Sequence, residues 1–351
     1  MSRLEKLREV FPEKADAILI TDELNVRYLS GVDYTDGFLL VTKKEAWLFA
    51  DSRYIEVAKR DAAKGFEVVL LEKKRTEHIK DKLGDKATVF YEDASTTCAQ
   101  LSAYIKGTEN TVFRPAGAIV EKLRNIKDES EKQSIIRAQR IAESAFEHIL
   151  GFISPDVTEA DVALELEYFM RKNGAEAIAF DTIAVSGTAS SMPHGVPRRK
   201  RLEKGFLTMD FGAKYNGYCS DMTRTVCIGK PTDEMKKVYG TVLSAQMSAL
   251  EYIAAGKRCA DADKVARDII ASAGYGKCFG HSLGHGVGLY IHEGISLSPR
   301  SQDTLEKGNV VTVEPGIYLE ERFGVRIEDM VYVTENGYEN LTKAKKELII
   351  L

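Results

Sequence analysis

The chain has 351 residues, of which 44% are hydrophobic and 29% are charged, a composition typical of globular proteins. Its 49 basic and 53 acidic residues leave a net charge of −4, which argues against nucleic acid or a membrane surface as a partner. No run of about 18 apolar residues is present to span a membrane, and the charged start MSRLEKLREVF does not resemble a signal peptide. The five cysteines are scattered and form no CxxC pair, which favours free thiols in a reducing cytoplasm.

The first part of the chain alternates apolar runs with a helical pattern. Strands are expected at 16–20, within a hairpin at 37–50, and at 66–71, 87–91 and 110–113. A helix is expected over 52–63, directly after the hairpin. Strands separated by helical patterns predict an α/β domain with a parallel or mixed sheet. We place the end of this domain at residue 124, so that residues 1–124 and 125–351 form two domains.

The second part opens with a long helical pattern and contains three more. These helices are expected at 127–153, 158–174, 232–256 and 260–274. Thr158 and Asp161 form a capping box at the start of the second one. The two shorter helices share a polar start, an apolar stripe and a glycine stop, and a strand-rich stretch follows each. This similarity indicates a duplicated unit of helix and hairpin, and helices packed on antiparallel hairpins predict an α+β domain.

Two aspartates interrupt a predicted hairpin at residues 206–229. An Asn-Gly pair between two strand-like runs is a strong hairpin signal, and Asp210 and Asp221 lie one in each run. A turn centred on Asn216 and Gly217 would offset the two aspartates diagonally by two residues, and a turn one residue earlier would place them directly opposite. Both registers leave the carboxylates on one face of the hairpin. Because two anions on one face repel each other, we expect a cation between them.

The same anomaly recurs in a second strand-rich stretch, residues 309–333. Glu314 ends an apolar run directly before a Pro-Gly pair, and Glu328 lies inside the run VRIEDMVYV. Alternation along this run places Arg326 on the same face as Glu328. Burying an acid on an apolar strand is costly unless a partner compensates its charge. These two glutamates therefore add to the two aspartates as candidate ligands of a cation.

Histidines are also concentrated at one place. Three of the six, His281, His285 and His292, lie in the glycine-rich segment GHSLGHGVGLYIHEG. The others include His78 and His148, which lie in polar helical runs and are expected at the surface. Taken singly, each acid or imidazole has an ordinary interpretation as a strand-edge, strand-end or loop residue. Together, two hairpins with the same anomaly and a histidine cluster predict four carboxylates and one imidazole converging on metal.

Five motifs, in this order along the chain, carry a resemblance to a known family. They are SMPHG (191–195), MDFGAKYNGYCSDMTRT (209–225), GHSLGHGVGLYIHEG (280–294), TVEPGIY (312–318) and GVRIED (324–329). The set resembles that of the pita-bread metallopeptidases, and within them the Xaa-Pro group of aminopeptidase P and prolidase. The resemblance covers about residues 127–351, and the first part, with FADSRY at 49–54, is similar to the smaller domain that accompanies them. It implies an α+β pita-bread catalytic domain preceded by a smaller α/β domain of creatinase type.

The resemblance also implies a metal centre. The positions that match the family's ligands are Asp210, Asp221, His285, Glu314 and Glu328. In the family these hold two divalent ions that share a bridging hydroxide, which attacks the carbonyl of the residue before proline. The oxygen-rich donor set favours Mn²⁺, and the imidazole leaves Co²⁺, Zn²⁺ and Fe²⁺ open. No cysteine falls at a ligand position.

Further residues take supporting roles by resemblance. Glu314 matches the family's general base, and His194 and His292 match histidines that hold the substrate and stabilise the tetrahedral intermediate. His281 matches a histidine beside the metal ligand. Arg326 is expected to orient Glu328 or to relay protons through Tyr318, and Tyr318 is itself a candidate substrate-binding residue. A last position remains open: Phe180 is either a wall for the proline ring or an ordinary core residue.

Three functional interpretations remain open. The first is an Xaa-Pro aminopeptidase, which acts on peptides of several lengths with proline in the second position. The second is a prolidase, which cleaves only dipeptides and must recognise the carboxylate of proline, for which Arg300 is a candidate partner. The third is a non-catalytic pita-bread binding module, which we rank last because all five ligand positions are retained. The resemblance further implies a homodimer.

Overall fold

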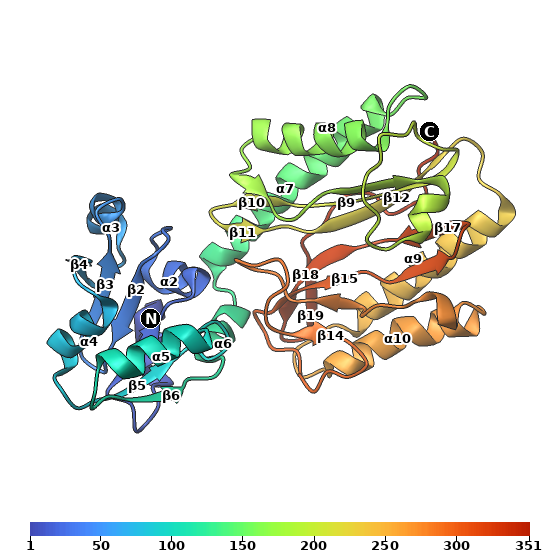
Figure 1. The fold of residues 1–351 in the computed structure, drawn as a ribbon. Coiled ribbons are helices and arrows are strands. Elements are labelled where there is room, and N and C mark those ends of the chain that lie inside the picture. The colour runs from blue at the N-terminus through green and yellow to red at the C-terminus, as the bar shows by residue number, and fades with distance from the viewer. The chain divides into compact units, whose positions relative to one another are not determined.

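The computed structural model describes all 351 residues. The contacts within the chain divide it into two compact units, Met1–Arg124 and Asn125–Leu351 (Figure 1). None of the helices combines the length and the apolar composition that a membrane span needs.

The first unit is built on a mixed six-stranded sheet with the order β4-β3-β2-β1-β5-β6. Its strands are β1 (Ala17–Ile20), β2 (Phe38–Val41), β3 (Ala46–Ala50), β4 (Glu67–Leu70), β5 (Thr88–Tyr91) and β6 (Val112–Pro115). Its helices are α1 (Arg3–Glu9), α2 (Glu23–Ser30), α3 (Ile55–Asp61), α4 (Arg75–Leu83), α5 (Cys98–Gly107) and α6 (Ile119–Asn125), the last reaching the unit's end. β1 pairs antiparallel with β2 and parallel with β5, so the predicted mixed sheet is confirmed.

One prediction for this unit is wrong. His78 was expected at the surface, but its residue is only 7% exposed. Its ring lies 5.0 Å from the ring of Phe49, and its Nε2 accepts a hydrogen bond from the main-chain N–H of Lys73. A helical pattern rich in charged residues does not reveal a single position that turns toward the sheet. The companion prediction for His148 is confirmed, because that residue is exposed.

The second unit contains two similar halves. The first half has helices α7 (Glu129–Phe152) and α8 (Glu159–Lys172) and a sheet in which β9 (Gly205–Phe211) lies between β8 (Ile183–Ser186) and β12 (Met222–Ile228). The second half has helices α9 (Asp233–Tyr252) and α10 (Cys259–Ser272) and a sheet in which β18 (Asp329–Thr334) lies between β15 (Val310–Val313) and β19 (Gly337–Asn340). In Figure 1 the strands of this unit lie between the two helix pairs.

Short elements complete the second unit. The remaining strands are β7 (Ala177–Ile178), β10 (Ala213–Tyr215), β11 (Tyr218–Cys219), β13 (Gly284–His285), β14 (Ser296–Leu297), β16 (Gly316–Leu319) and β17 (Phe323–Arg326). Two 3₁₀ turns, η1 (Gly187–Ser191) and η2 (Gly276–Cys278), are also present. The halves repeat each other in detail: the residue before α8, Thr158, bridges to Arg201, and the residue before α10, Arg258, bridges to Thr304. These matches support the duplication that the sequence indicates.

The first hairpin adopts one of the two registers left open by the sequence. Asn216 and Gly217 have φ angles of 49° and 79°, as a type I′ turn requires, and Tyr215 pairs with Tyr218 across them. Asp210 consequently pairs with Thr223, and Asp221 is offset from it diagonally. The turn therefore determines how the two aspartates face the same side.

A buried ion pair joins the two halves. Arg224 on β12 donates from Nη2 to Asp329 on β18 over 2.8 Å, and their side chains are 2% and 0% exposed. Lys346 donates to the other carboxylate oxygen of Asp329 over 2.8 Å. Burial alone would raise the pKa of Asp329, but these two cations outweigh it and hold the pKa below its ordinary value. The pair places β12, which directly follows Asp221, next to β18, which directly follows Glu328.

Two alanine substitutions should change stability in opposite directions. Gly217→Ala introduces a Cβ at a positive φ and should destabilise the unit by about 1 kcal/mol. Gly240→Ala, at an exposed site within α9 where a Cβ meets no atom within 4 Å, should stabilise it by about 0.5 to 1 kcal/mol. Urea unfolding of the full chain measures both, and a Gly217→Ala variant as stable as the parent would contradict the turn assignment.

Candidate active site

The sequence-predicted ligands come from separate elements and meet at one cavity. Asp210 lies on β9, Asp221 directly before β12, His285 on β13, Glu314 after β15 and Glu328 between β17 and β18. All five line a cavity of about 600 Å³. The hairpins and the glycine-rich segment are thus brought to one place in the fold.

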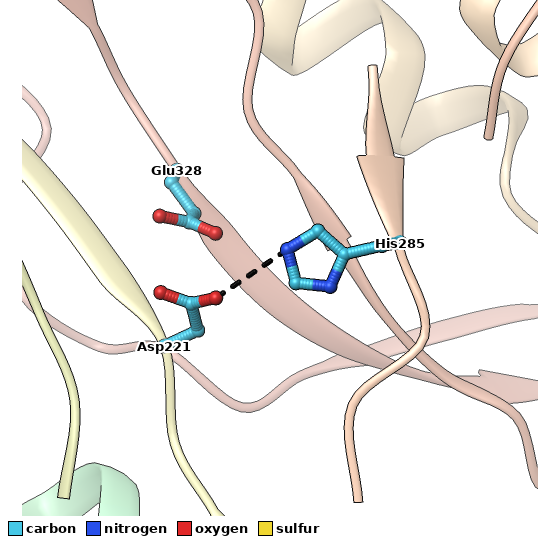
Figure 2. Close-up of side chains that lie close together, drawn as sticks. All are labelled: Asp221, His285 and Glu328. Carbon is cyan, nitrogen blue, oxygen red and sulfur yellow. Dashed lines mark ion pairs between the residues drawn. The ribbon is translucent and has the colours of Figure 1, made fainter. Parts of the chain in front are cut away.

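Three of these side chains form a compact group (Figure 2). A ligand atom of each of Asp221, His285 and Glu328 lies within 4.8 Å of the others, and the three side chains point toward one another. His285 Nε2 lies 3.5 Å from Asp221 Oδ2 and 3.4 Å from Glu314 Oε1. The distances leave room for a cation among carboxylate oxygens and one imidazole nitrogen, the donors that divalent first-row metals accept.

The unsatisfied atoms of the site also fit a cation. Asp210 Oδ1 and Glu328 Oε1 are buried and have no hydrogen-bond partner in the protein. A buried carboxylate oxygen without a partner is strongly unfavourable, and a divalent cation would compensate both. The donor set of the cavity therefore fits a bound divalent metal.

Burial and mutual repulsion raise the pKa values of three acids of the cavity when no cation is present. Burial, followed by the charges of the neighbouring carboxylates, raises the pKa of Asp221 and of Glu328 well above the ordinary value. Burial raises the pKa of Glu314 to about 8, although Arg326 opposes the shift. Asp221, Glu314 and Glu328 therefore bind protons more readily than ordinary carboxyl groups do, and a bound cation would favour their ionised forms.

Hydrogen bonds determine the tautomer of His285. Its Nδ1 lies 3.2 Å from the carbonyl oxygen of Gly286, which can only accept, so Nδ1 carries the proton. Burial, with a smaller effect of His292, lowers the pKa of His285 to about 4, and the ring is neutral near pH 7. The free lone pair on Nε2 points toward Asp221 and Glu314, as a metal ligand requires.

Arg326 connects several groups of the site. Its Nη2 donates to Asp210 over 2.6 Å, its Nη1 to the hydroxyl of Tyr318 over 2.8 Å, and its Nε to Thr223 over 3.0 Å. It was expected to orient Glu328, but it does so only through Thr223, whose hydroxyl donates to Glu328 over 2.7 Å. The predicted contact with Tyr318 is present.

His281 and Tyr318 form a pair behind the metal ligands. The Nδ1 of His281 donates to the carbonyl oxygen of Ser282, so its Nε2 accepts from the Tyr318 hydroxyl over 2.9 Å. Burial, then the charge of Arg326, lowers the pKa of His281 to about 4. His281 lines the cavity, whereas Tyr318 does not and reaches it only through its partners. Tyr318 was expected to touch the substrate, and the structure instead gives it contacts with His281 and Arg326.

Two threonines of the site were missed from the sequence. Thr223 joins Arg326 to Glu328, and Thr312 accepts from the main-chain N–H of His285 and donates to Glu314 over 3.1 Å. Each lies two residues from a ligand, Thr223 from Asp221 and Thr312 from Glu314. Strand alternation places such neighbours on one face, so this spacing could have revealed them.

The other predicted residues differ in their position. His194, His292 and Phe180 line the cavity. Arg300 is exposed in the segment after β14 and does not line it, so the structure does not bring this guanidinium to the site. The rest of the wall contains apolar residues (Ile183, Pro193, Val196, Pro197 and Ile291), polar residues (Asp181, Thr182, Ser282 and Ser296) and two glycines (Gly195 and Gly284).

Comparison with protein families agrees with this geometry. The model of metallopeptidase family M24 matches residues 133–335, which contain every residue of the metal centre described above. The chain belongs to metallopeptidase family M24. The model of the creatinase/prolidase N-terminal domain matches residues 3–126. The predicted family and the predicted pita-bread fold with its creatinase-type first domain are thereby confirmed, and the protein is a metallopeptidase.

Relatives with solved structures are similar along the whole chain. A structure titled Xaa-Pro dipeptidase from Bacillus anthracis is 45% identical, covers 99% of both chains and superposes with a TM-score of 0.95. A structure titled X-Pro aminopeptidase from Thermotoga maritima is 38% identical, covers 100% of both chains and has a TM-score of 0.92. Among curated proteins, the Xaa-Pro dipeptidase of Pyrococcus furiosus is 38% identical over 99% of each chain.

The raised pKa of Glu314 predicts how the stability of this M24 peptidase depends on pH without metal. Because the folded pKa of about 8 exceeds the unfolded value, the contribution of Glu314 to stability is fully present below the unfolded pKa and is lost as the pH rises through about 8. The shifts of His281 and His285 act only below about pH 6.5, where these rings gain protons on unfolding. From about pH 6.5 to about pH 8, the Glu314 contribution should therefore fall by roughly 1 to 2 kcal/mol. The raised pKa values of Asp221 and Glu328 act in the same direction, so the chelated protein should lose at least this much stability.

Urea unfolding at the two pH values measures this loss. Glu314→Gln should reduce the pH dependence, and saturating Mn²⁺ should remove it because the ion favours the ionised acids. A chelated protein that becomes more stable over this range would contradict the assignment.

Proposed function

We propose that this M24 peptidase hydrolyses the bond between an amino-terminal residue and proline, and that it acts on peptides longer than dipeptides. The similar proteins named for Xaa-Pro substrates support the proline specificity. One feature of the cavity supports the aminopeptidase activity: Arg326 is the only arginine or lysine that lines it, and its guanidinium already bonds Asp210, Tyr318 and Thr223.

The metal centre is the first part of the proposed mechanism. Asp210, Asp221, His285, Glu314 and Glu328 would hold two divalent ions, with Mn²⁺ favoured by the oxygen-rich donor set. Bound ions would supply a water-derived nucleophile at neutral pH and polarise the scissile carbonyl.

Glu314 is the proton acceptor in this proposal. Thr312 donates to its Oε1, and Arg326 Nε lies 4.0 Å from its Oε2, so the carboxylate is held in one orientation. Its pKa of about 8 without metal marks a carboxylate that can gain a proton near neutral pH, as a general base requires.

Two imidazoles face the space that remains for the peptide. His194 and His292 line the cavity and are exposed. Burial is the main cause that lowers the pKa of His292, so its ring is neutral near pH 7 and offers one N–H. That N–H would stabilise the negative charge that develops on the carbonyl oxygen during attack. Phe180 and its apolar neighbours would receive the proline ring.

The lack of a free cationic side chain at the cavity favours an aminopeptidase over a dipeptidase. A dipeptide places the carboxylate of its proline inside the site, where a free cation must pair with it or its burial is costly. No free arginine or lysine lines the cavity, and Arg300 lies outside it. A longer peptide carries its carboxylate out of the cavity. The dipeptidase remains the second candidate because two close relatives are named for that activity.

A series of substrate lengths tests this choice. With Mn²⁺ present, kcat/KM for Xaa-Pro-Yaa tripeptides should equal or exceed that for the matching Xaa-Pro dipeptide, and Xaa-Ala-Yaa controls should be poor substrates. Tripeptides cleaved about 100-fold less efficiently than the dipeptide would instead establish a prolidase.

Metal removal tests whether peptide hydrolysis depends on a metal ion. Chelation should abolish peptide hydrolysis, and Mn²⁺ should restore it. Asp221→Asn should lower the bound metal and reduce kcat/KM by about 100-fold or more, because that carboxylate forms one group with His285 and Glu328, with their ligand atoms within 4.8 Å of one another. Full activity of the chelated protein would favour a mechanism without metal, and a protein inactive in every metal would favour a binding module.

A further inference from the structure

A buried ion pair lies behind the loop that carries His292. Lys127 Nζ lies 3.0 Å from Glu293 Oε1, and the two side chains are 2% and 8% exposed. Lys127 precedes α7, whereas Glu293 directly follows His292. Removing two charges from water is expensive, and a buried pair of this kind is weak evidence of a gain in stability. Its position therefore suggests a role in the site.

Glu293 organises the loop of residues 286–294. Its main-chain N–H donates to the carbonyl oxygen of Gly286 over 2.9 Å, and its Oε2 accepts from the N–H of Tyr290 over 3.1 Å. A Cβ at Gly288 would lie 1.8 Å from Glu293 Oε1, so the loop is closed tightly around this carboxylate. The next residue, Gly294, has a φ of +69° and turns the chain away.

The ring of His292 has no comparable support of its own. Neither of its nitrogens makes a hydrogen bond within the protein, and its ring contacts are those with His285, at 4.3 Å and 67°, and with Tyr290, at 6.3 Å and 77°. The direction of the imidazole therefore depends on the course of the main chain. The side chain of the neighbouring residue, Glu293, holds that main chain together with Cys219, whose N–H donates to the carbonyl oxygen of Gly288 over 2.8 Å.

The main chain around Lys127 is held by hydrogen bonds to the segment before β15. Its N–H donates to the carbonyl oxygen of Gly308 over 2.8 Å, and the preceding Asn125 accepts at its carbonyl oxygen from the side chain of Asn309 over 3.0 Å. Gly308 in turn donates to Val333 on β18. The main chain of Lys127 is thus connected to the sheet whose strands β15 and β18 adjoin Glu314 and Glu328.

We propose that Lys127 and Glu293 are positioning residues, which hold the loop 286–294 so that the His292 imidazole faces the cavity in the orientation needed for catalysis. The role of His292 rests on the proposed function, whereas the restraint of the loop does not. Because the pair acts through His292, its loss affects kcat more than metal binding or KM. A displacement of about 1 Å in such a group can cost up to about 100-fold in rate.

The test compares Lys127→Met, Lys127→Arg and Glu293→Gln with a matched control, Lys132→Met. Lys132 is also a largely buried lysine near the start of α7, but it pairs with Glu339 and does not contact the loop. Hydrogen exchange of residues 286–294, measured without metal, should accelerate in K127M and E293Q and stay unchanged in K127R and K132M. Unchanged exchange in both K127M and E293Q would overturn the proposal.

Kinetics with metal test the connection to His292. K127M should lower kcat by about 10 to 100-fold with KM changed less than about threefold and bound metal unchanged, and K127R should recover most of the loss. In a His292→Ala background K127M should cost nothing further, since both changes remove the same contribution. Losses that multiply in the double variant would overturn the positioning role. If K127M does not fold, E293Q supports the same comparisons, because its amide oxygen can still accept from Tyr290.

The proposed function and the positioning role of the ion pair can be refuted independently. A wild-type protein that cleaves no Xaa-Pro peptide would refute the proposed function, and the exchange measurements would still decide whether the ion pair restrains the loop. Normal Xaa-Pro cleavage with a fully active K127M would refute the positioning role alone.

Discussion

Four carboxylates crowded into one buried cavity are the constraint to which the rest of the catalytic unit responds. Their mutual repulsion and their burial raise the pKa values of Asp221, Glu314 and Glu328, so the arrangement is unfavourable without a cation. The protein offers only partial compensation: Arg326 neutralises Asp210, and the hydroxyls of Thr223 and Thr312 each donate to one glutamate. The remaining unfavourable charge is the reason that the cavity fits a divalent cation, which would stabilise the ionised forms of these acids.

The duplicated fold brings these acids together from distant parts of the chain. Each half contributes one hairpin with two acids, and the buried pair of Arg224 and Asp329 holds the two sheets in contact beside Asp221 and Glu328. Asp329 remains ionised because two cations surround it, in contrast to Glu328 one residue earlier, which is directed into the cavity. Two adjacent acids thus differ in environment: Asp329 is paired with two cations, and Glu328 is a candidate metal ligand.

Neutral imidazoles complete the site without adding charge. His281 and His285 are both neutral near pH 7, and main-chain carbonyls set their tautomers, so that one nitrogen of each is free to accept. His292 differs because no hydrogen bond holds its ring, and its loop depends on the pair of Lys127 and Glu293. The cavity consequently combines a hydrogen-bonded side, which carries the candidate metal ligands, with a side on which the direction of His292 depends on a loop.

The sequence by itself determined the elements and the chemistry of this protein. Residue patterns indicated the mixed sheet, the long helices, the Asn-Gly hairpin and the acids that contradict their apolar strands, because periodicity records which side of an element is buried. Only the tertiary structure decided between the two hairpin registers and showed that Arg326 pairs with Asp210. It also showed that Arg300 does not line the cavity and that His78 is buried. It also revealed that Lys127 meets Glu293. Such pairings join residues far apart in the chain, and they depend on how elements pack rather than on any local pattern.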